Sequence, residues 1–243
     1  MSAVRPLLEG QVAIVTGAGR GIGHAIAHAF AREGARVVLA ARTRQELAAT
    51  AAAIRESGGT ALAIPTDVTQ DGAVEAMVEQ ATGELGRVDV LVTAAGAASF
   101  GPVVGTKPAD WDTILAVNLR AVMVCCRAVL PVMIRQRRGT IINIASVAAQ
   151  RPIAGAAVYT ATKAGVVGFS RVLAEELRGD GVRVGVLVPG AVDTPLWDTI
   201  ANPPDRSRML RPEDVARAAV LMASLPPGAS LEELTLLPSG GIL

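Results

Sequence analysis

The sequence predicts a single domain of the α/β class, built as a doubly wound parallel seven-stranded sheet with helices on both faces. Short apolar or β-branched runs alternate along the chain with longer stretches that carry apolar residues at helical spacing. The strand segments are apolar on both faces, which is typical of a parallel sheet covered on each side. A chain of 243 residues with 51% hydrophobic content can also bury one sizeable core.

The expected elements alternate in regular order. Strands are expected at 12–15, 37–40, 61–64, 88–92, 140–144, 182–188 and 234–237, and helices at about 21–33, 43–57, 71–84, 109–136, 156–178 and 212–223. Glycines follow several of the helices, and Pro212 stands in the first turn of the last one. In a sheet of this kind the ligand crevice lies at the carboxyl ends of the strands.

Composition excludes several classes of partner. The formal net charge is +1, and acids and bases are spread along the chain, so we expect neither a nucleic acid nor a membrane surface as partner. The most apolar long stretch contains Asp112, Arg120 and Arg127, which argues against membrane insertion. The two cysteines, Cys125 and Cys126, are sequence neighbours that cannot form an ordinary disulfide. We therefore expect a cytoplasmic protein with a small-molecule partner.

A glycine-rich segment, TGAGRGIG at residues 16–23, follows the first expected strand and opens a helix. Glycines let the backbone turn sharply and approach a pyrophosphate, whose charge is favoured by the free N–H groups of the helix start. The segment therefore predicts a dinucleotide site. The residues expected to contact the cofactor here are Gly17, Gly19, Arg20, Gly21 and Ile22.

The spacing G-x-x-x-G-x-G resembles that of the short-chain dehydrogenase/reductase family, and further matches run in order through nearly the whole chain. They are Asp67-Val68, Ala95-Gly96, Asn118, Ser146, Tyr159-x-x-x-Lys163 and Pro189-Gly190-x-x-x-Thr194. The resemblance implies a Rossmann-like NAD(P)-binding fold and an enzyme that interconverts a carbonyl compound and its alcohol. It also implies a homotetramer or homodimer formed through the two long helices, at about 109–136 and 156–178.

Four residues are candidates for the chemistry. Tyr159 and Lys163 lie four residues apart on an expected helix, so their side chains share one face, and Ser146 ends the fifth strand. A free phenol has a pKa of about 10, and a nearby ammonium group favours the phenolate. Tyr159 is therefore expected to act as general acid/base, with Ser146 hydrogen-bonding the same substrate oxygen. The resemblance implies that Lys163 also binds the nicotinamide ribose and that Asn118 supports a water-mediated proton relay.

The choice of cofactor follows from charge. NAD-binding sites commonly carry an acid near the end of the second strand, but here Ala41 occupies that position and Arg42 follows it. Two guanidinium groups, of Arg20 and Arg42, suit the 2′-phosphate of NADP, so NADP is expected in preference to NAD. Asp67 is expected to accept a hydrogen bond from the adenine, with Val68 beside the ring. The remaining expected cofactor contacts are Thr93, Ala95, Gly96, Pro189, Gly190, Val192 and Thr194.

Two features depart from the family pattern or invite another interpretation. Thr93-Ala94 replaces the family's usual Asn-Asn before Ala-Gly, and we expect Thr93 to take over part of the lost hydrogen bonding. His24 and His28 are four residues apart on a helix and could share a metal. No third ligand is evident nearby, so we expect surface residues and no metal site.

The substrate is expected between the nicotinamide, the segments 97–100 and 147–153, and a short lid at about 195–211 that contains Trp197. These segments are mostly apolar, with Gln150 as the main polar group, so we expect a hydrophobic ketone, aldehyde or 3-oxoacyl compound. Two alternatives remain: a 3-oxoacyl-[acyl-carrier-protein] reductase and a catalytically silent dinucleotide-binding regulatory protein. Glu175, where the family's acyl-carrier reductases tend to have a basic residue, argues against the first. The complete catalytic set argues against the second.

Overall fold

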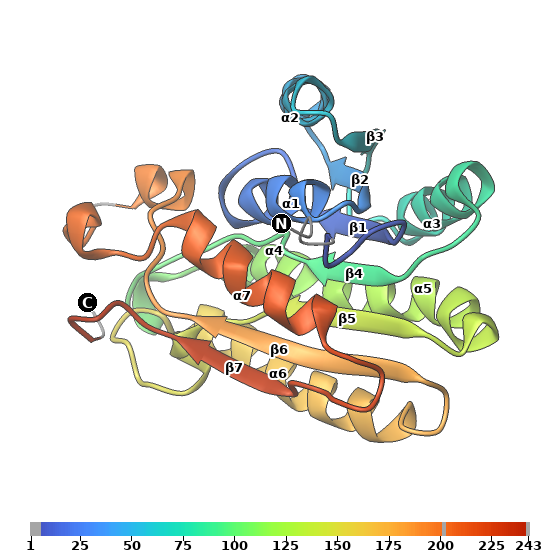
Figure 1. Cartoon of the computed structure of the whole chain (residues 1–243). Helices are drawn as coiled ribbons and strands as arrows, with labels where there is room; N and C mark the ends of the chain where they lie inside the picture. The colour runs from blue at the N-terminus through green and yellow to red at the C-terminus, as the bar shows by residue number, and fades with distance from the viewer. Residues whose placement is uncertain (1–5, 201–202, 242–243) are drawn as a thin grey trace.

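The computed structural model describes residues 6–200 and 203–241. Within these ranges all seven strands belong to one parallel sheet with the order β3-β2-β1-β4-β5-β6-β7 (Figure 1). The strands are β1 Val12–Thr16, β2 Arg36–Ala41, β3 Thr60–Pro65, β4 Val90–Thr93, β5 Gly139–Ile144, β6 Val182–Pro189 and β7 Glu233–Leu236. The order reverses next to β1, so a ligand crevice is expected outside the carboxyl ends of β1 and β4.

Helices cover both faces of this sheet (Figure 1). They are α1 Gly21–Arg32, α2 Arg44–Glu56, α3 Asp71–Leu85, α4 Pro108–Leu115, α5 Ala121–Gln136, α6 Ala157–Glu176 and α7 Pro212–Ser224. Side chains of α1, α2 and α7 join one buried cluster against the strands, while those of α3, α5 and α6 join another on the opposite face. The sequence-based prediction of a doubly wound α/β fold is therefore confirmed.

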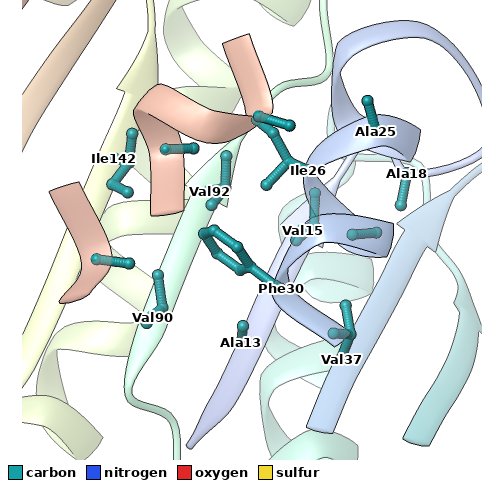
Figure 2. Close-up of a cluster of buried hydrophobic side chains, with 14 of the residues drawn as sticks. Ala13, Val15, Ala18, Ala25, Ile26, Phe30, Val37, Val90, Val92 and Ile142 are labelled. Atoms are coloured by element: carbon teal, nitrogen blue, oxygen red, sulfur yellow. The ribbon is translucent and has the colours of Figure 1, made fainter. Parts of the chain in front are cut away.

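The core places the first helix over the sheet. Figure 2 shows Ile26 and Phe30 of α1 among Val15, Val90 and Val92 of the central strands, and Phe30 has no exposed surface. Residues four apart lie on one face of a helix, so these two side chains together hold α1 against β1 and β4. As a result the amino end of α1 lies at the carboxyl end of β1.

The long helix expected at 109–136 contains an irregular turn. Helices α4 and α5 are joined by a π-helical turn at Ala116–Arg120, which includes Asn118. A π-turn adds a residue to the helical repeat and is common at functional sites, but helical periodicity in the sequence does not reveal it. The strand expected to begin at Val88 begins two residues later, because the backbone of Val88 bonds instead to the side-chain amide of Gln136.

A buried network of polar side chains joins the middle strands to helix α6. The hydroxyl of Thr93 donates to Asn143 Oδ1 at 2.7 Å, and Asn143 Nδ2 donates to Ser170 Oγ at 2.8 Å. Ser170 in turn donates to the Val166 carbonyl oxygen. Thr93, Asn143 and Ser170 are each at most 3% exposed. The expectation that Thr93 supplies hydrogen bonding on the central strand is therefore met through Asn143.

One helical stretch in the described ranges, Pro108–Gln136, is long and apolar enough to cross a bilayer by length and composition alone. In this fold it packs against α3, β4, β5 and α6. Arg120 and Arg127 on it form ion pairs with Asp71 and Glu75 at the start of α3. These contacts are those of a helix that covers a sheet.

Replacement of Asn143 tests the buried network. We expect Asn143→Leu to lower the free energy of unfolding by about 3 kcal/mol, because it leaves buried hydroxyl groups without partners. Urea denaturation measures this change. Gln80→Leu, which removes only an exposed bond to Glu84, is the matched control and should change the stability by about 0.5 kcal/mol or less. Equal effects of the two substitutions would contradict the role of the network.

Candidate active site

The glycine loop lies at the carboxyl end of β1 and packs closely on its surroundings. Gly17 has a positive φ of 69°, and a Cβ atom added there would lie 2.8 Å from the backbone nitrogen of Ala95. A Cβ at Gly23 would overlap the carbonyl oxygen of Gly17. Helix α1 begins at Gly21, and the side chain of its N-cap residue, Arg20, makes no capping hydrogen bond. The free N–H groups of this helix start form a cradle that fits a pyrophosphate.

The loop after β6 borders the same helix start. The methyl-bearing side chain of Thr194 lies 3.4 Å from the position of a Cβ on Gly21. Val192 pairs with Leu210 in an isolated parallel bridge, and the backbone of Gly190 is hydrogen-bonded to Leu236 of β7. Thr194 therefore lies beside the start of α1, and the contacts of Pro189, Gly190, Val192 and Thr194 with the cofactor stay a prediction. Pro189 is the last residue of β6.

The segments expected to border the adenosine carry one carboxylate, of Asp67, and two guanidinium groups, of Arg20 and Arg42. Asp67 accepts hydrogen bonds from the backbone and hydroxyl groups of Thr69 at 3.0 and 2.8 Å, and Val68 is buried beside it. These bonds, and to a smaller extent the charge of Arg42, hold the pKa of Asp67 below its usual value. Arg20 and Arg42 are exposed, and neither forms an ion pair within the described ranges.

Ser146 and Tyr159 come together from a strand end and a helix start. Ser146 follows β5 and accepts a hydrogen bond from Ala148 at 3.2 Å, while Tyr159 lies in the first turn of α6. Burial raises the pKa of Tyr159, and a hydrogen bond with Ser146 offsets part of this rise. The four-residue spacing in the sequence predicted the opposite direction, with the phenolate favoured by Lys163. Desolvation outweighs that attraction, since the Lys163 ammonium lies 5.8 Å from the centre of the phenol ring.

Lys163 is a buried amine held by a backbone carbonyl group. Its Nζ donates a hydrogen bond of 2.9 Å to the Ile144 oxygen at the end of β5, and the residue is 5% exposed. Burial lowers the pKa of Lys163 to about 8. The amine also lies 3.9 Å from where a Cβ on Gly96 would stand, so a larger residue at position 96 would approach it. Lys163 therefore faces both the phenol and the loop after β4.

Asn118 is fully buried in the π-turn and positions the loop after β4. Its Oδ1 accepts from the Ala97 backbone nitrogen and its Nδ2 donates to the Ala97 carbonyl oxygen, both at 2.8 Å. The same amide donates to Thr162 Oγ1 on α6 at 3.3 Å. The side-chain amide is thus committed to protein groups, and it connects the loop that carries Gly96 to the helix that carries Tyr159.

Aromatic side chains close the space beside Tyr159. The ring of Phe100 lies 5.9 Å from that of Tyr159 and 6.3 Å from that of Trp197, to which it is nearly parallel at 8°. Trp197 stands in a 3-10 turn, Pro195–Thr199, and its indole nitrogen donates to the Val192 carbonyl oxygen. The segments expected to border the substrate, 97–100 and the lid, therefore meet at this aromatic pair.

The lid segment is tied down by one arginine. Arg206, in the 3-10 turn Arg206–Arg208, forms ion pairs with Asp193 and Asp198 and donates to the Thr194 carbonyl oxygen. These bonds join both short turns of the lid to the loop after β6. Residues 201 and 202 of the expected lid lie outside the described ranges.

Two sequence-based expectations about the direction of side chains need correction. Thr93, expected at the cofactor, is buried with its hydroxyl bonded to Asn143, so that side chain faces the core. Gln150, expected to offer a polar group to the substrate, instead bonds Glu233 and Thr235 of β7. Side-chain direction after a strand end depends on the neighbouring strand, which is distant in sequence.

His24 and His28 were expected on the surface, and both are half-buried. His24 Nδ1 lies 3.0 Å from Thr50 Oγ1, and the two imidazole rings are 4.5 Å apart. Burial lowers the pKa of both histidines. Helices α2 and α7 cover this face of α1, which the helical periodicity of α1 alone does not indicate. Among the described residues no group of three or more metal-ligating side chains occurs.

Thr162 was not singled out in the sequence and contributes to the site. It has no exposed surface, donates to the Tyr159 carbonyl oxygen at 2.7 Å and accepts from Asn118. The signal available was a hydroxyl residue adjacent to Lys163, on the face of the helix that carries the catalytic candidates. A threonine within a helix is common, so this signal has little specificity.

Comparison with known proteins agrees with this geometry. The family model described as short chain dehydrogenase matches residues 11–205. The short-chain reductase protein NovJ of Streptomyces niveus is 46% identical over 192 residues, which cover 79% of this chain and 73% of NovJ. A metagenomic short-chain oxidoreductase solved in complex with NADP is 40% identical, with a TM-score of 0.85 over 96% of this chain and 99% of that one. An actinorhodin polyketide ketoreductase variant solved with NADPH is 31% identical, with a TM-score of 0.87 over 94% and 96% of the chains.

The fold and the relatives define an oxidoreductase that binds NAD(P) and acts on CH–OH groups. The chain belongs to the short-chain dehydrogenase/reductase family. The glycine loop fits the dinucleotide, because Gly17 and Gly23 let the loop pack on the backbone of Ala95 and on its own backbone, which keeps the free N–H groups of the helix start at the carboxyl end of β1.

The lowered pKa of Lys163 can be tested through the pH dependence of the free energy of unfolding. In the unfolded chain Lys163 keeps its proton to a pKa of about 10.4, whereas in the folded chain its pKa is about 8. Between these values the unfolded chain binds more protons, so stability rises with pH. We expect the free energy of unfolding of the wild type to rise by about 3 kcal/mol relative to that of Lys163→Met as the pH rises from about 8 to about 10.5. Urea denaturation measures this change. Lys107→Met, at an exposed lysine, is the control and should show no such trend. Parallel stability curves for wild type and Lys163→Met would contradict the lowered pKa.

Proposed function

We propose that this chain is an NADP(H)-dependent oxidoreductase that interconverts a carbonyl compound, namely a ketone, aldehyde or 3-oxoacyl compound, and its alcohol, with Tyr159 as general acid/base. The observation that carries the proposal is the meeting of the Tyr159 and Ser146 hydroxyl groups beside the buried amine of Lys163. These groups stand at the carboxyl ends of strands, on the same edge of the sheet as the glycine cradle.

The chemistry follows from the state of each group. A bound nicotinamide supplies or accepts the hydride. Because burial raises its pKa, the Tyr159 phenol keeps its proton at neutral pH and can give it to the carbonyl oxygen. The Ser146 hydroxyl donates a hydrogen bond to that oxygen while negative charge develops on it. The Lys163 ammonium stabilises the phenolate that remains.

Asn118 takes part as a positioning residue in this proposal. Its amide bonds hold the Ala97 backbone and Thr162, so the loop after β4 and helix α6 keep a constant distance. Lys163 would bind the nicotinamide ribose, as the family resemblance implies. The preference for NADP is supported by Arg20 and Arg42, which can bind a 2′-phosphate with charge-assisted hydrogen bonds. The solved relatives with NADP and NADPH also favour it.

The substrate is proposed to be apolar near its carbonyl group. Phe100 and Trp197 present nearly parallel rings beside Tyr159, and they account for two of the six aromatic residues of the chain. Gln150 faces β7, which leaves this side of the site with apolar side chains. The likeness to a polyketide ketoreductase supports a ketone as substrate.

We also propose one domain over residues 1–243, a homotetramer or homodimer, and a cytoplasmic location. Exposed apolar side chains on the two long helices support association through them; these are Leu115, Met123, Ile134 and Val172. Two free, buried cysteines support a reducing compartment.

Tyr159→Phe tests the catalytic assignment. We expect kcat for NADPH-dependent reduction to fall by about 10²- to 10⁴-fold, because the proton donor is lost while the ring remains. NADPH oxidation is followed by absorbance with a panel of ketones, aldehydes and 3-oxoacyl thioesters, and NADPH binding by fluorescence. Thr160→Ala, at the next position on α6, is the control and should retain activity. Full turnover by Tyr159→Phe would refute the mechanism, and a wild type that binds NADPH but reduces none of the panel would favour a silent binding protein.

Arg42→Asp tests the cofactor assignment. The substitution replaces a guanidinium group with a carboxylate beside the expected 2′-phosphate, so kcat/KM for NADPH should fall by about tenfold or more. The same constant for NADH should change much less. Arg44→Asp, at another exposed arginine two residues further on, is the control for a general change of charge. Equal losses with both cofactors in Arg42→Asp would remove the argument for a 2′-phosphate contact.

A further inference from the structure

An acidic side chain lies directly over the glycine loop. Glu46, in the first turn of α2, places Oε2 2.7 Å from where a Cβ on Gly19 would stand, and its own Cβ lies 3.0 Å from that point. The glycine at position 19 therefore leaves space that the Glu46 side chain occupies. The residue is half-buried between α2 and the loop.

The carboxylate of Glu46 has no structural partner that explains this position. Thr43 is the N-cap of α2, and the spacing Thr43-x-x-Glu46 is that of a capping box, in which the glutamate would accept from the N-cap backbone. No such bond forms here, and Thr43 makes no side-chain capping bond. Within the described ranges the carboxylate forms no hydrogen bond or ion pair. Its oxygen atoms are not enclosed by protein groups, so they are available to accept a hydrogen bond from a ligand bound over the glycine loop.

The surroundings of Glu46 identify that ligand group. Arg20 follows Gly19 directly, and Arg42 follows β2 two residues before α2 begins. In doubly wound folds the ribose of the adenosine lies between the glycine loop and the end of the second strand. There an acid accepts a hydrogen bond from the ribose 2′-hydroxyl, and a base binds the 2′-phosphate. In this chain the acid lies over the glycine loop, while the two arginines belong to that loop and to the segment after β2.

We propose that Glu46 is a cofactor-specificity residue, whose carboxylate accepts a hydrogen bond from an adenosine ribose hydroxyl and repels the 2′-phosphate. Arg20 and Arg42 attract the phosphate that Glu46 opposes, so the preference for NADPH is reduced and NADH is also used. The inference rests on the cofactor part of the proposed function and is independent of Tyr159.

The position of Glu46 also explains why the sequence indicated no acid. The expected place was the end of β2, where Ala41 stands. Glu46 is five residues further along, and it reaches the glycine loop only because α2 turns back over that loop. The residue at the end of β2 alone therefore does not predict which charged side chains border the ribose.

Binding of half-cofactors tests this inference without any catalysis. Calorimetry compares adenosine 2′,5′-bisphosphate with AMP, which differ by the 2′-phosphate, in the wild type and in Glu46→Gln. The glutamine keeps the shape and a hydrogen-bond acceptor but removes the charge. We expect Glu46→Gln to bind the bisphosphate about tenfold more tightly relative to AMP, and this gain should shrink at high salt. The ratio of kcat/KM for NADPH over NADH should rise in parallel.

Glu56→Gln, at the exposed last residue of α2, is the matched control and should leave the ratio unchanged. Glu46→Ser removes the acceptor as well as most of the side chain. It should also raise the affinity for the bisphosphate relative to AMP, and it should lower the affinity for AMP itself. An unchanged or lowered preference in Glu46→Gln would overturn the inference. If Tyr159 proves inactive as a catalyst, these binding ratios still decide the role of Glu46.

Discussion

The close packing of Gly23 on the carbonyl group of Gly17 determines where helix α1 begins. Only a residue without a side chain allows the helix to start so near the strand end. With α1 held there by Ile26 and Phe30, its free N–H groups face the edge of the sheet where β1, β4 and β5 all end. Every other part of the site, from Thr194 to the phenol, is arranged around that starting point.

Burial sets the chemistry at this edge as much as charge does. The Lys163 amine is shielded from water and Tyr159 is partly buried, and the two shifts of pKa have opposite directions: each group moves toward its neutral form. The nearly parallel rings of Phe100 and Trp197 add apolar surface beside these groups. In such surroundings a hydrogen bond to a developing negative charge is stronger than in water.

Much of the fold and of the candidate site could be predicted from the sequence, because both depend on local patterns. Alternating strand-like and helix-like apolar patterns indicated a doubly wound parallel sheet. The four-residue spacing of Tyr159 and Lys163 indicated that their side chains share one helix face. What could not be predicted involves contacts between segments that are distant in sequence. The direction of Gln150 depends on β7, the burial of His24 depends on α2, and the reach of Glu46 depends on how α2 crosses the glycine loop. The π-turn at Asn118 likewise follows from its bonds to Ala97 and not from helical propensity.

The burial of Lys163 has a consequence for chemical labelling. The chain has two lysines, and the amine of Lys163 is enclosed by the fold, so Lys107 carries the one lysine side chain exposed to solvent in the described ranges. Acylating dyes and cross-linkers that react with lysine would therefore attach at a single side chain, just before α4. The surface positive charge, carried almost wholly by guanidinium groups, would remain intact under such treatment.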